Sequence, residues 1–324
     1  MTVAVLLPLA VSVLLAGSGR RLGRMLPPRT AAVLLTLSGL AAALATGFVL
    51  AVLGFTVAAR DPELAEVGHW SARALIAVDP VPLTAGTAAG LLVTGLAAAA
   101  VTRAARTGRQ LWAAGATCRR LPHTAGLVVV HDDRPDAYAL PGLSGRVVVS
   151  TGMLRRLPAG ERRVLLAHES AHLAGRHHLY VQLAGLAAAA NPLLRPVAAA
   201  VEYAVERWAD EHAAAVAGDR QLAARALARA WVARRSGAGP LPPSLRDLAR
   251  GAALAAASSA VTERARALLA PPPRPRRLPT AARLGLTAAS VSAGPVTAHD
   301  TEHRFEQAQS AYRATASASA PALP

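Results

Sequence analysis

The sequence has no lysine, a single cysteine and few aromatic residues, and these absences narrow the class of protein. With Cys118 alone, no intramolecular disulfide can form, which excludes a disulfide-stabilised secreted domain. All 35 basic residues are arginine, and because only 19 residues are acidic the net charge is +16. The exclusive use of arginine is typical of a GC-rich genome and indicates nothing about function.

Charged residues are also missing from three long stretches, residues 2–19, 30–59 and 80–102. A helix needs about 20 apolar residues to cross the hydrocarbon core of a bilayer, so each stretch is a candidate span, the first being marginal in length. We therefore expect a membrane domain over residues 1–110 with three transmembrane helices. Residues 284–298 are a weaker candidate for a fourth span, and a loosely packed helix or a disordered tail fits them nearly as well.

Arginines beside these stretches orient the chain in the membrane. They cluster between the first two stretches and after the third, at Arg20, Arg21, Arg24, Arg29, Arg103, Arg106, Arg109, Arg119 and Arg120. The positive-inside rule then predicts that the N-terminus is outside and that everything after the third span is cytoplasmic. Because the arginines flank the spans, anionic lipid headgroups are their expected partner, and we expect no direct binding of nucleic acid.

A largely apolar helical segment contains His168, Glu169 and His172 in an HExxH pattern. The spacing of four places both imidazoles on one face of a helix, where they can bind one metal ion. Glu169 lies beside them and can take a proton from an attacking water. Zinc suits such ligands, in a near-tetrahedral set that leaves one position open for chemistry. A surface helix with two solvated histidines is the alternative, and the apolar neighbours argue against it.

Three carboxylates follow at spacings of four in a second apolar helical stretch, at Glu202, Glu206 and Asp210. A solvated acidic stripe paired with arginines would show the same spacing, but the apolar residues between the acids favour a buried metal. We predict that Glu206 is the third zinc ligand and that Asp210 accepts a hydrogen bond from a zinc-bound imidazole. Tyr203 and His212 are candidates for the donor that stabilises the oxyanion.

Short strands are expected over residues 127–130, 137–140 and 146–150, ahead of the HExxH helix. A small sheet followed by such a helix is the zincin arrangement, in which an edge strand can align an extended peptide. The predicted fold class is mainly α, with multi-pass transmembrane helices plus a small α+β zincin-like metalloprotease domain over residues 111–270. Residues 179–194 are uncharged but short, and we expect a hydrophobic hairpin there.

The C-terminal part of the chain changes in composition. Residues 271–283 are rich in proline and arginine and are expected to form a stiff linker that leads back to the membrane. Residues 299–324 are polar and rich in alanine and serine, so a disordered tail is expected.

The HExxH motif at residues 168–172 and the E-x-x-A-D pattern at residues 206–210 resemble those of the membrane metallopeptidases of the BlaR/MecR antirepressor type. The segments at residues 137–142 and 147–152 resemble strands of that family, and the likeness covers roughly residues 120–220. It implies a zinc ion held by the two motif histidines and Glu206, with Glu169 as catalytic base. Residues 299–324 are too few to build the extracellular penicillin-binding sensor of the best-known members.

The sequence therefore predicts an integral-membrane, zinc-dependent endopeptidase that cleaves a protein at the cytoplasmic face. The resemblance implies that the substrate is a transcriptional repressor, such as a winged-helix protein, or the enzyme itself. An HtpX-like quality-control protease and a non-proteolytic signal transducer with a structural zinc site are the alternatives. The oligomeric state is not predicted.

Overall fold

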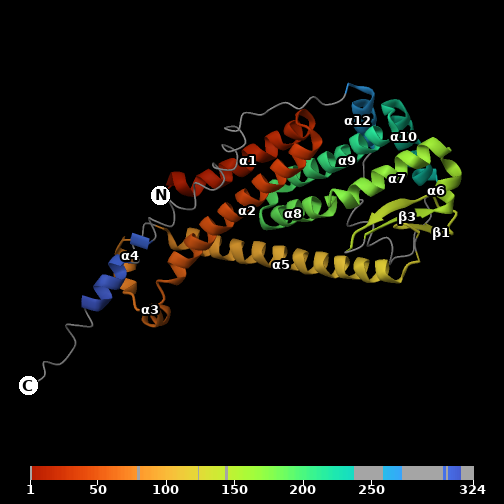
Figure 1. The fold of residues 1–324 in the computed structure, drawn as a ribbon. Coiled ribbons are helices and arrows are strands. Elements are labelled where there is room, and N and C mark those ends of the chain that lie inside the picture. Colours follow the sequence, from red (N-terminus) through yellow and green to blue (C-terminus); the bar gives the residue numbers. More distant parts are fainter. Residues whose placement is uncertain are drawn as a thin grey trace, which may run out of the picture.

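A computed structural model describes residues 2–78, 81–122, 124–142, 145–236, 258–271, 302–303 and 306–314, with the side chains of all of these except 2–5, 78 and 258–260. Helices dominate, and one small sheet lies at the end of the molecule away from the N-terminus (Figure 1). The elements are α1 (Thr2–Met25), α2 (Pro28–Ala58), α3 (Pro62–Gly68), α4 (Ala72–Val78), α5 (Leu83–Arg120), β1 (Leu127–Val130), β2 (Ala137–Leu140), β3 (Arg146–Ser150), α6 (Thr151–Arg156), α7 (Ala159–Ala174), α8 (His177–Ala190), η1 (Pro192–Leu194), α9 (Arg195–Ala217), α10 (Arg220–Ser236) and α12 (Ser258–Leu269).

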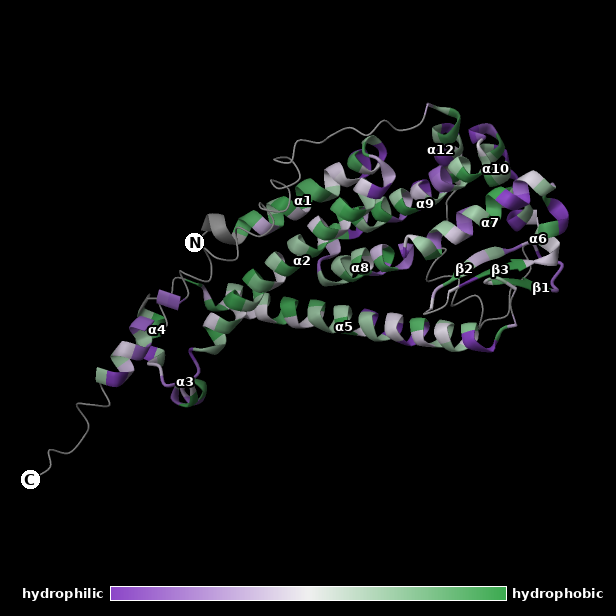
Figure 2. Cartoon of the chain, in the orientation of Figure 1, coloured by the Kyte–Doolittle hydropathy of each residue, from purple (hydrophilic) through white to green (hydrophobic). Residues whose placement is uncertain are grey.

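Two helices in the described part of the chain, α2 and α5, are long and apolar enough to cross a membrane. In the most apolar stretch of α5 only 11% of the residues are buried, so this helix is not the core helix of a soluble domain. Hydrophobic residues run along both helices (Figure 2). These two candidate spans indicate a membrane protein.

Helices α2 and α5 pack closely where two glycines face each other. A Cβ atom added to Gly54 of α2 would lie 2.6 Å from the Cα atom of Gly90 of α5, nearer than real Cβ contacts come. Small residues at a helix crossing let two backbones approach, which is how helices gain packing contacts in lipid. The crossing therefore fixes how the two apolar helices lie against each other.

The uncharged segment at residues 179–194 forms most of α8 and the turn η1, and α9 returns from that turn to complete a hairpin. Its two helices pack against α1 and α2, and their small residues share one core with those helices (Figure 1). The turn is buried at Asn191, whose Nδ2 donates to Ser12 Oγ at 2.9 Å and to Thr46 Oγ1 at 3.2 Å. The hairpin turn therefore lies level with the middle of α2. Helix α9 continues from the turn and runs back toward the end of the molecule that contains α7.

The three predicted strands form one sheet in the order β1-β3-β2, with β1 parallel and β2 antiparallel to β3. Val148 and Val149 are adjacent in β3 and both are buried, so both faces of this strand are covered, as expected for the central strand. Helix α7 packs on β2 and β3, and β2 is an edge strand beside it. The predicted fold class, mainly helical with a small mixed sheet, is confirmed.

Domain limits drawn from composition differ from the structure in two places. Helix α5 continues past the predicted boundary at residue 110 to Arg120 and ends at the sheet, because its arginine-rich second half is still a good helix former. Residues 306–314, in the tail expected to be disordered, are helical, and Ala308 is buried with its carbonyl 3.0 Å from the Ser71 nitrogen.

Two of the remaining sequence predictions concern residues that the structure does not describe. The linker, apart from its first residue, and the candidate fourth span at residues 284–298 lie outside the described residues. The first predicted span begins within residues 1–5, whose side chains are not described. The search that found α2 and α5 covered only the described residues, so the first span stays a prediction.

Candidate metal centre

Helix α7 carries the HExxH motif. It begins after Pro158 and has Glu161 in its first turn, as its sequence predicted. Val164 and Leu165 are buried on the side that packs into the domain, which fixes the rotation of the helix. The same rotation turns the two motif histidines toward α9, where their side chains are 14% and 18% exposed.

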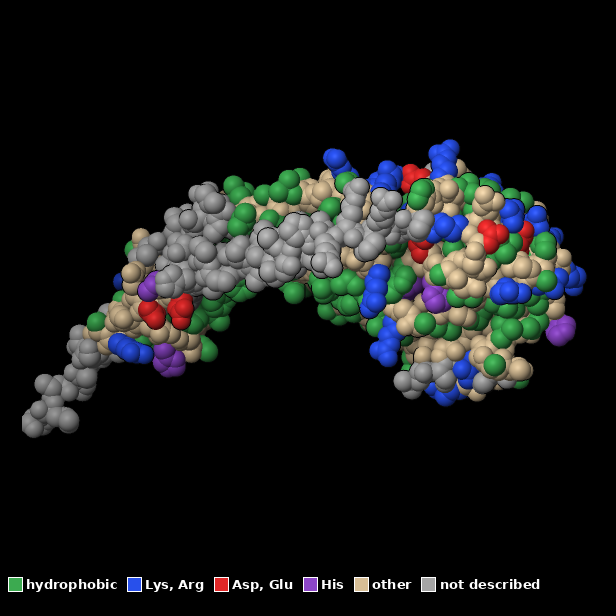
Figure 3. All heavy atoms as spheres, turned by 45° about the horizontal axis from the view of Figure 1, so that its top comes forward, with side chains coloured by type: hydrophobic (Ala, Val, Ile, Leu, Met, Phe, Trp, Pro, Cys, Tyr) green, Lys and Arg blue, Asp and Glu red, His purple; other side chains and the backbone are tan. Residues whose placement is uncertain are grey.

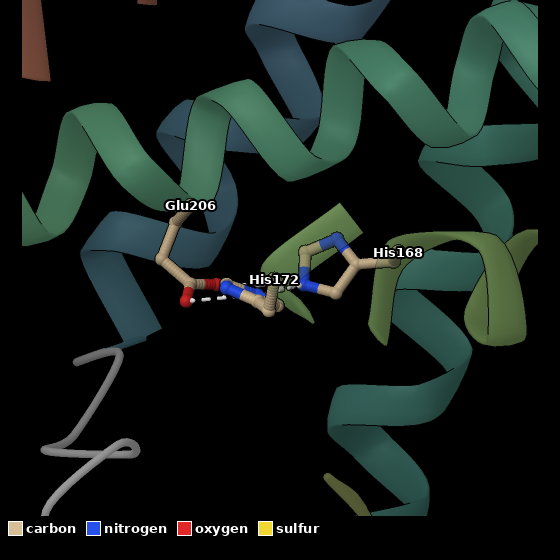
Figure 4. Close-up of side chains that lie close together, drawn as sticks. All are labelled: His168, His172 and Glu206. Atoms are coloured by element: carbon tan, nitrogen blue, oxygen red, sulfur yellow. Dashed lines mark hydrogen bonds and ion pairs between the residues drawn. The ribbon is translucent and has the colours of Figure 1, made fainter. Parts of the chain in front are cut away.

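Helix α9 brings Glu206 to these histidines (Figure 4). Glu206 Oε2 lies 3.7 Å from His168 Nε2, and Oε1 lies 3.5 Å from His172 Nε2. The two imidazole Nε2 atoms are 3.1 Å apart. One ligand atom from each of the three residues lies within 4.8 Å of the other two. Two imidazole nitrogens and one carboxylate oxygen that converge in this way are the donor set of a catalytic zinc site with one position left open.

Asp210 lies one turn beyond Glu206 and contacts the other side of the His168 ring. Its Oδ1 atom is 3.1 Å from His168 Nδ1. Burial disfavours a charged imidazole, but hydrogen bonds to Asp210 and Glu206 outweigh it and raise the pKa of His168 to about 9. Burial also opposes the Asp210 carboxylate, and the Arg264 guanidinium overrides this and lowers the pKa of Asp210 to about 2.

His172 has a corresponding partner that the sequence did not reveal. His177 Nδ1, at the start of α8, lies 3.1 Å from His172 Nδ1. Burial lowers the pKa of His172, so this ring is neutral. Because His172 Nε2 faces His168, we assign the single ring proton of His172 to Nδ1, which donates it to His177 Nδ1. This tautomer leaves the Nε2 lone pair of His172 free for a metal.

The chain reaches this arrangement through a short break between α7 and α8, at residues 175 and 176. Arg176 has a left-handed backbone with φ of 49°. A Cβ atom at Gly175 would lie 2.3 Å from His177 Nε2, so only glycine leaves room for the buried ring. His177 is the first residue of α8, and the left-handed backbone of Arg176 before it brings the His177 ring onto His172.

A cavity of about 80 Å³ opens beside the metal centre. Glu169 is 5% exposed and lines this cavity together with His168 and Glu206. The rest of the wall is mostly apolar and comes from α7, α9, α10 and α12. Arg234 of α10 also lines it, with Nη2 3.5 Å from Glu169 Oε1, and the same guanidinium donates to the carbonyl of Ala137 in the edge strand β2.

The two predicted oxyanion donors lie elsewhere on α9. Neither Tyr203 nor His212 is among the residues that line the cavity, and His212 is exposed. Both lie on the same helix as Glu206, but neither turns toward the cavity when α9 places Glu206 there. Arg234 of α10 does reach the cavity, and no local pattern distinguishes it from the other arginines of that helix.

Comparison with known protein families gives a match to part of the chain. Residues 101–194 match the model of Peptidase family M48. The match covers the second half of α5, the sheet, α7 and α8, and it ends before Glu206. Comparisons with curated proteins and with solved structures gave no match. Over these residues the chain is similar to the M48 peptidases, which depend on zinc, and the His-His-Glu group agrees with that similarity.

Proposed function

We propose that this protein is a membrane-embedded zinc endopeptidase in which His168, His172 and Glu206 bind the metal and Glu169 is the general base. The observation that supports this most directly is the convergence of three ligand atoms within 4.8 Å, next to a cavity that Glu169 lines. The family match ends before Glu206, so the assignment of that ligand depends on the geometry alone.

Each residue of the site has a definite part in peptide hydrolysis. Zinc bound there would acidify a water molecule and polarise the scissile carbonyl. Glu169 accepts the proton of the attacking water and passes it to the leaving amine. Asp210 and His177 hold the two imidazoles with Nε2 toward the metal. Arg234 places a positive charge at the cavity, where negative charge develops on the carbonyl oxygen.

Contacts with the membrane helices support a position of this site near the bilayer surface. Arg29 immediately precedes the uncharged stretch of α2, and its guanidinium lies 5.6 Å from the ring centre of Trp208, two residues from Glu206. Arg103 immediately follows the uncharged stretch of α5 and packs against Gly185 of α8. Because these arginines mark where the hydrocarbon core ends, Glu206 lies within a few helical turns of the headgroups.

The surface of the protease end agrees with this position. Arginine side chains gather there (Figure 3). Basic side chains next to a span bind anionic headgroups. Together with the arginines between the first two spans and after the third, this favours a catalytic domain on the cytoplasmic side.

The proposed substrate is a regulatory protein, either a winged-helix repressor or the enzyme itself. A quality-control protease for damaged membrane proteins is the alternative, and the position near the bilayer is compatible with both. Purified full-length protein in nanodiscs should cut a co-encoded repressor at one site and leave an unfolded casein-type chain intact. Broad degradation of the unfolded chain would instead favour quality control. A full cellular response from a cleavage-dead Glu169→Gln protein would favour the non-proteolytic transducer.

A further inference from the structure

The metal centre contains a buried cation that comes from a distant part of the chain. Arg264 of α12 is 4% exposed and projects toward α9. Helix α12 is held in place at both ends of its described part. Arg220 donates to the carbonyls of Leu268 at 2.9 Å and Ala267 at 3.0 Å, and Glu263 forms an ion pair with Arg24 of α1. The helix therefore presents Arg264 to the site from a fixed position.

The guanidinium of Arg264 binds two carboxylates at once. Its Nε and Nη2 atoms donate to Asp210 Oδ2 and Oδ1, both at 2.7 Å, which is a bidentate fork. Its Nη1 atom lies 2.7 Å from Glu206 Oε2. The five donors of an arginine lie in one plane, so holding both acids fixes their orientation relative to each other, which a lysine could not do.

These contacts divide the oxygens of the two acids between tasks. In Glu206, Oε2 binds Arg264 at 2.7 Å and lies farther, at 3.7 Å, from His168 Nε2, whereas Oε1 faces His172 Nε2 at 3.5 Å. In Asp210, Oδ1 accepts from both Arg264 and His168 Nδ1. A carboxylate with one oxygen held in this way presents the other alone to a metal ion. A free carboxylate can turn both oxygens to the metal and fill the position that chemistry requires.

We propose that Arg264 is a positioning residue that makes Glu206 a one-oxygen zinc ligand and keeps Asp210 on His168. This inference depends on the proposed zinc site, and it adds a requirement for a cation that is not itself a ligand. Arg264 also offsets the negative charge of Glu206 and Asp210, which it contacts directly, as Arg234 does for Glu169. Without the Arg264 guanidinium, those two carboxylates would lose their buried counter-charge and Glu206 would be a mobile ligand.

The alternative is that Arg264 only holds α12 against α9. Two substitutions separate these roles. Arg264→Gln removes both the charge and the fork, whereas Arg264→Lys keeps the charge and loses the fork. Arg266→Gln is the matched control, because Arg266 lies on the same helix and is exposed. Each full-length variant is reconstituted in nanodiscs and loaded with zinc or, for spectroscopy, with cobalt(II), whose visible absorption bands weaken when a fifth ligand is added.

We expect Arg264→Gln to bind one metal ion per chain with weakened cobalt bands, and to lose about 10–100-fold in kcat with little change in KM. Arg264→Lys should show the same weakening of the bands with a smaller loss of thermal stability, and Arg266→Gln should match the wild type. Unchanged bands and kcat within twofold in Arg264→Gln would overturn the inference. Loss of metal in step with loss of stability would overturn it too. A wild-type chain that binds no metal would instead refute the proposed function.

Discussion

Zinc affinity should depend steeply on pH because the metal competes with a proton on His168. In the metal-free chain burial opposes that proton, but the contacts to Asp210 and Glu206 prevail and raise the His168 pKa to about 9, whereas burial lowers the pKa of His172. Zinc needs both rings neutral, so at pH 7 it must displace one proton. Affinity should rise about tenfold per pH unit and level off near pH 9, a gain of about 100-fold from pH 7, or about 2.7 kcal/mol.

The measurement is competition for zinc against a chelator of known protonation constants, from pH 6.5 to 9.5. Asp210→Asn removes one of the two charges that favour the proton, so its slope between pH 7 and 9 should fall below that of the wild type. Glu202→Gln is the control, because this half-buried carboxylate lies on the same helix without contacting His168 and should leave the slope at one. A flat wild-type profile across this range, or an unchanged slope in Asp210→Asn, would refute the reasoning.

The same shift affects the metal-free fold. Because the folded pKa of His168 is raised above its ordinary value of 6.5, its contribution to stability is fully present below pH 6.5 and is lost as the pH rises through about 9. Added zinc should therefore stabilise the chain most strongly at the alkaline end of the range.

Two further predictions concern the groups that support the site. His177→Phe should lower zinc affinity by about 10–100-fold, measured by the same competition, because the His172 Nδ1 proton loses its acceptor; equal affinity would show that His177 does not orient the ligand. In a Cys118→Ala background, spin labels at Leu193→Cys and Leu179→Cys start from nearly equal exposure, 42% and 41%. If the hairpin turn enters the bilayer, the label at position 193 should collide with oxygen and be shielded from a water-soluble nickel complex. The label at position 179, near the zinc site, should be accessible to both reagents. Equal access of nickel to the two labels would contradict a turn that enters the bilayer.

Period and spacing were enough to predict the elements that hold the ligands. The interval of four between His168 and His172, and again between Glu206 and Asp210, places each pair on one helix face whatever the tertiary structure. The short runs of valine before the motif predicted strands because β-branched residues in brief apolar runs favour a buried sheet. The hairpin followed from geometry, because a single crossing would have separated Glu206 from the histidines.

The supporting residues could not be predicted because they depend on how elements meet. His177 reaches His172 through a left-handed turn at Arg176, a conformation that no local pattern demands. Arg264 lies 54 positions from Asp210, and nothing in a helix with several arginines marks the one that becomes buried. Tyr203 and His212 lie on the same helix as Glu206, but the rotation of α9 that delivers Glu206 turns neither of them to the cavity.

The central claim is that Glu169 is the base of a zinc peptidase whose metal is held by other residues. The most direct test measures zinc content and peptide cleavage on the same samples of wild type, Glu169→Gln and Glu206→Ala, each full length in nanodiscs. We predict one zinc ion per chain in the wild type and in Glu169→Gln, no cleavage by Glu169→Gln, and loss of both zinc and cleavage in Glu206→Ala. Cleavage that survives in Glu169→Gln, or zinc held at full affinity by Glu206→Ala, would contradict the account.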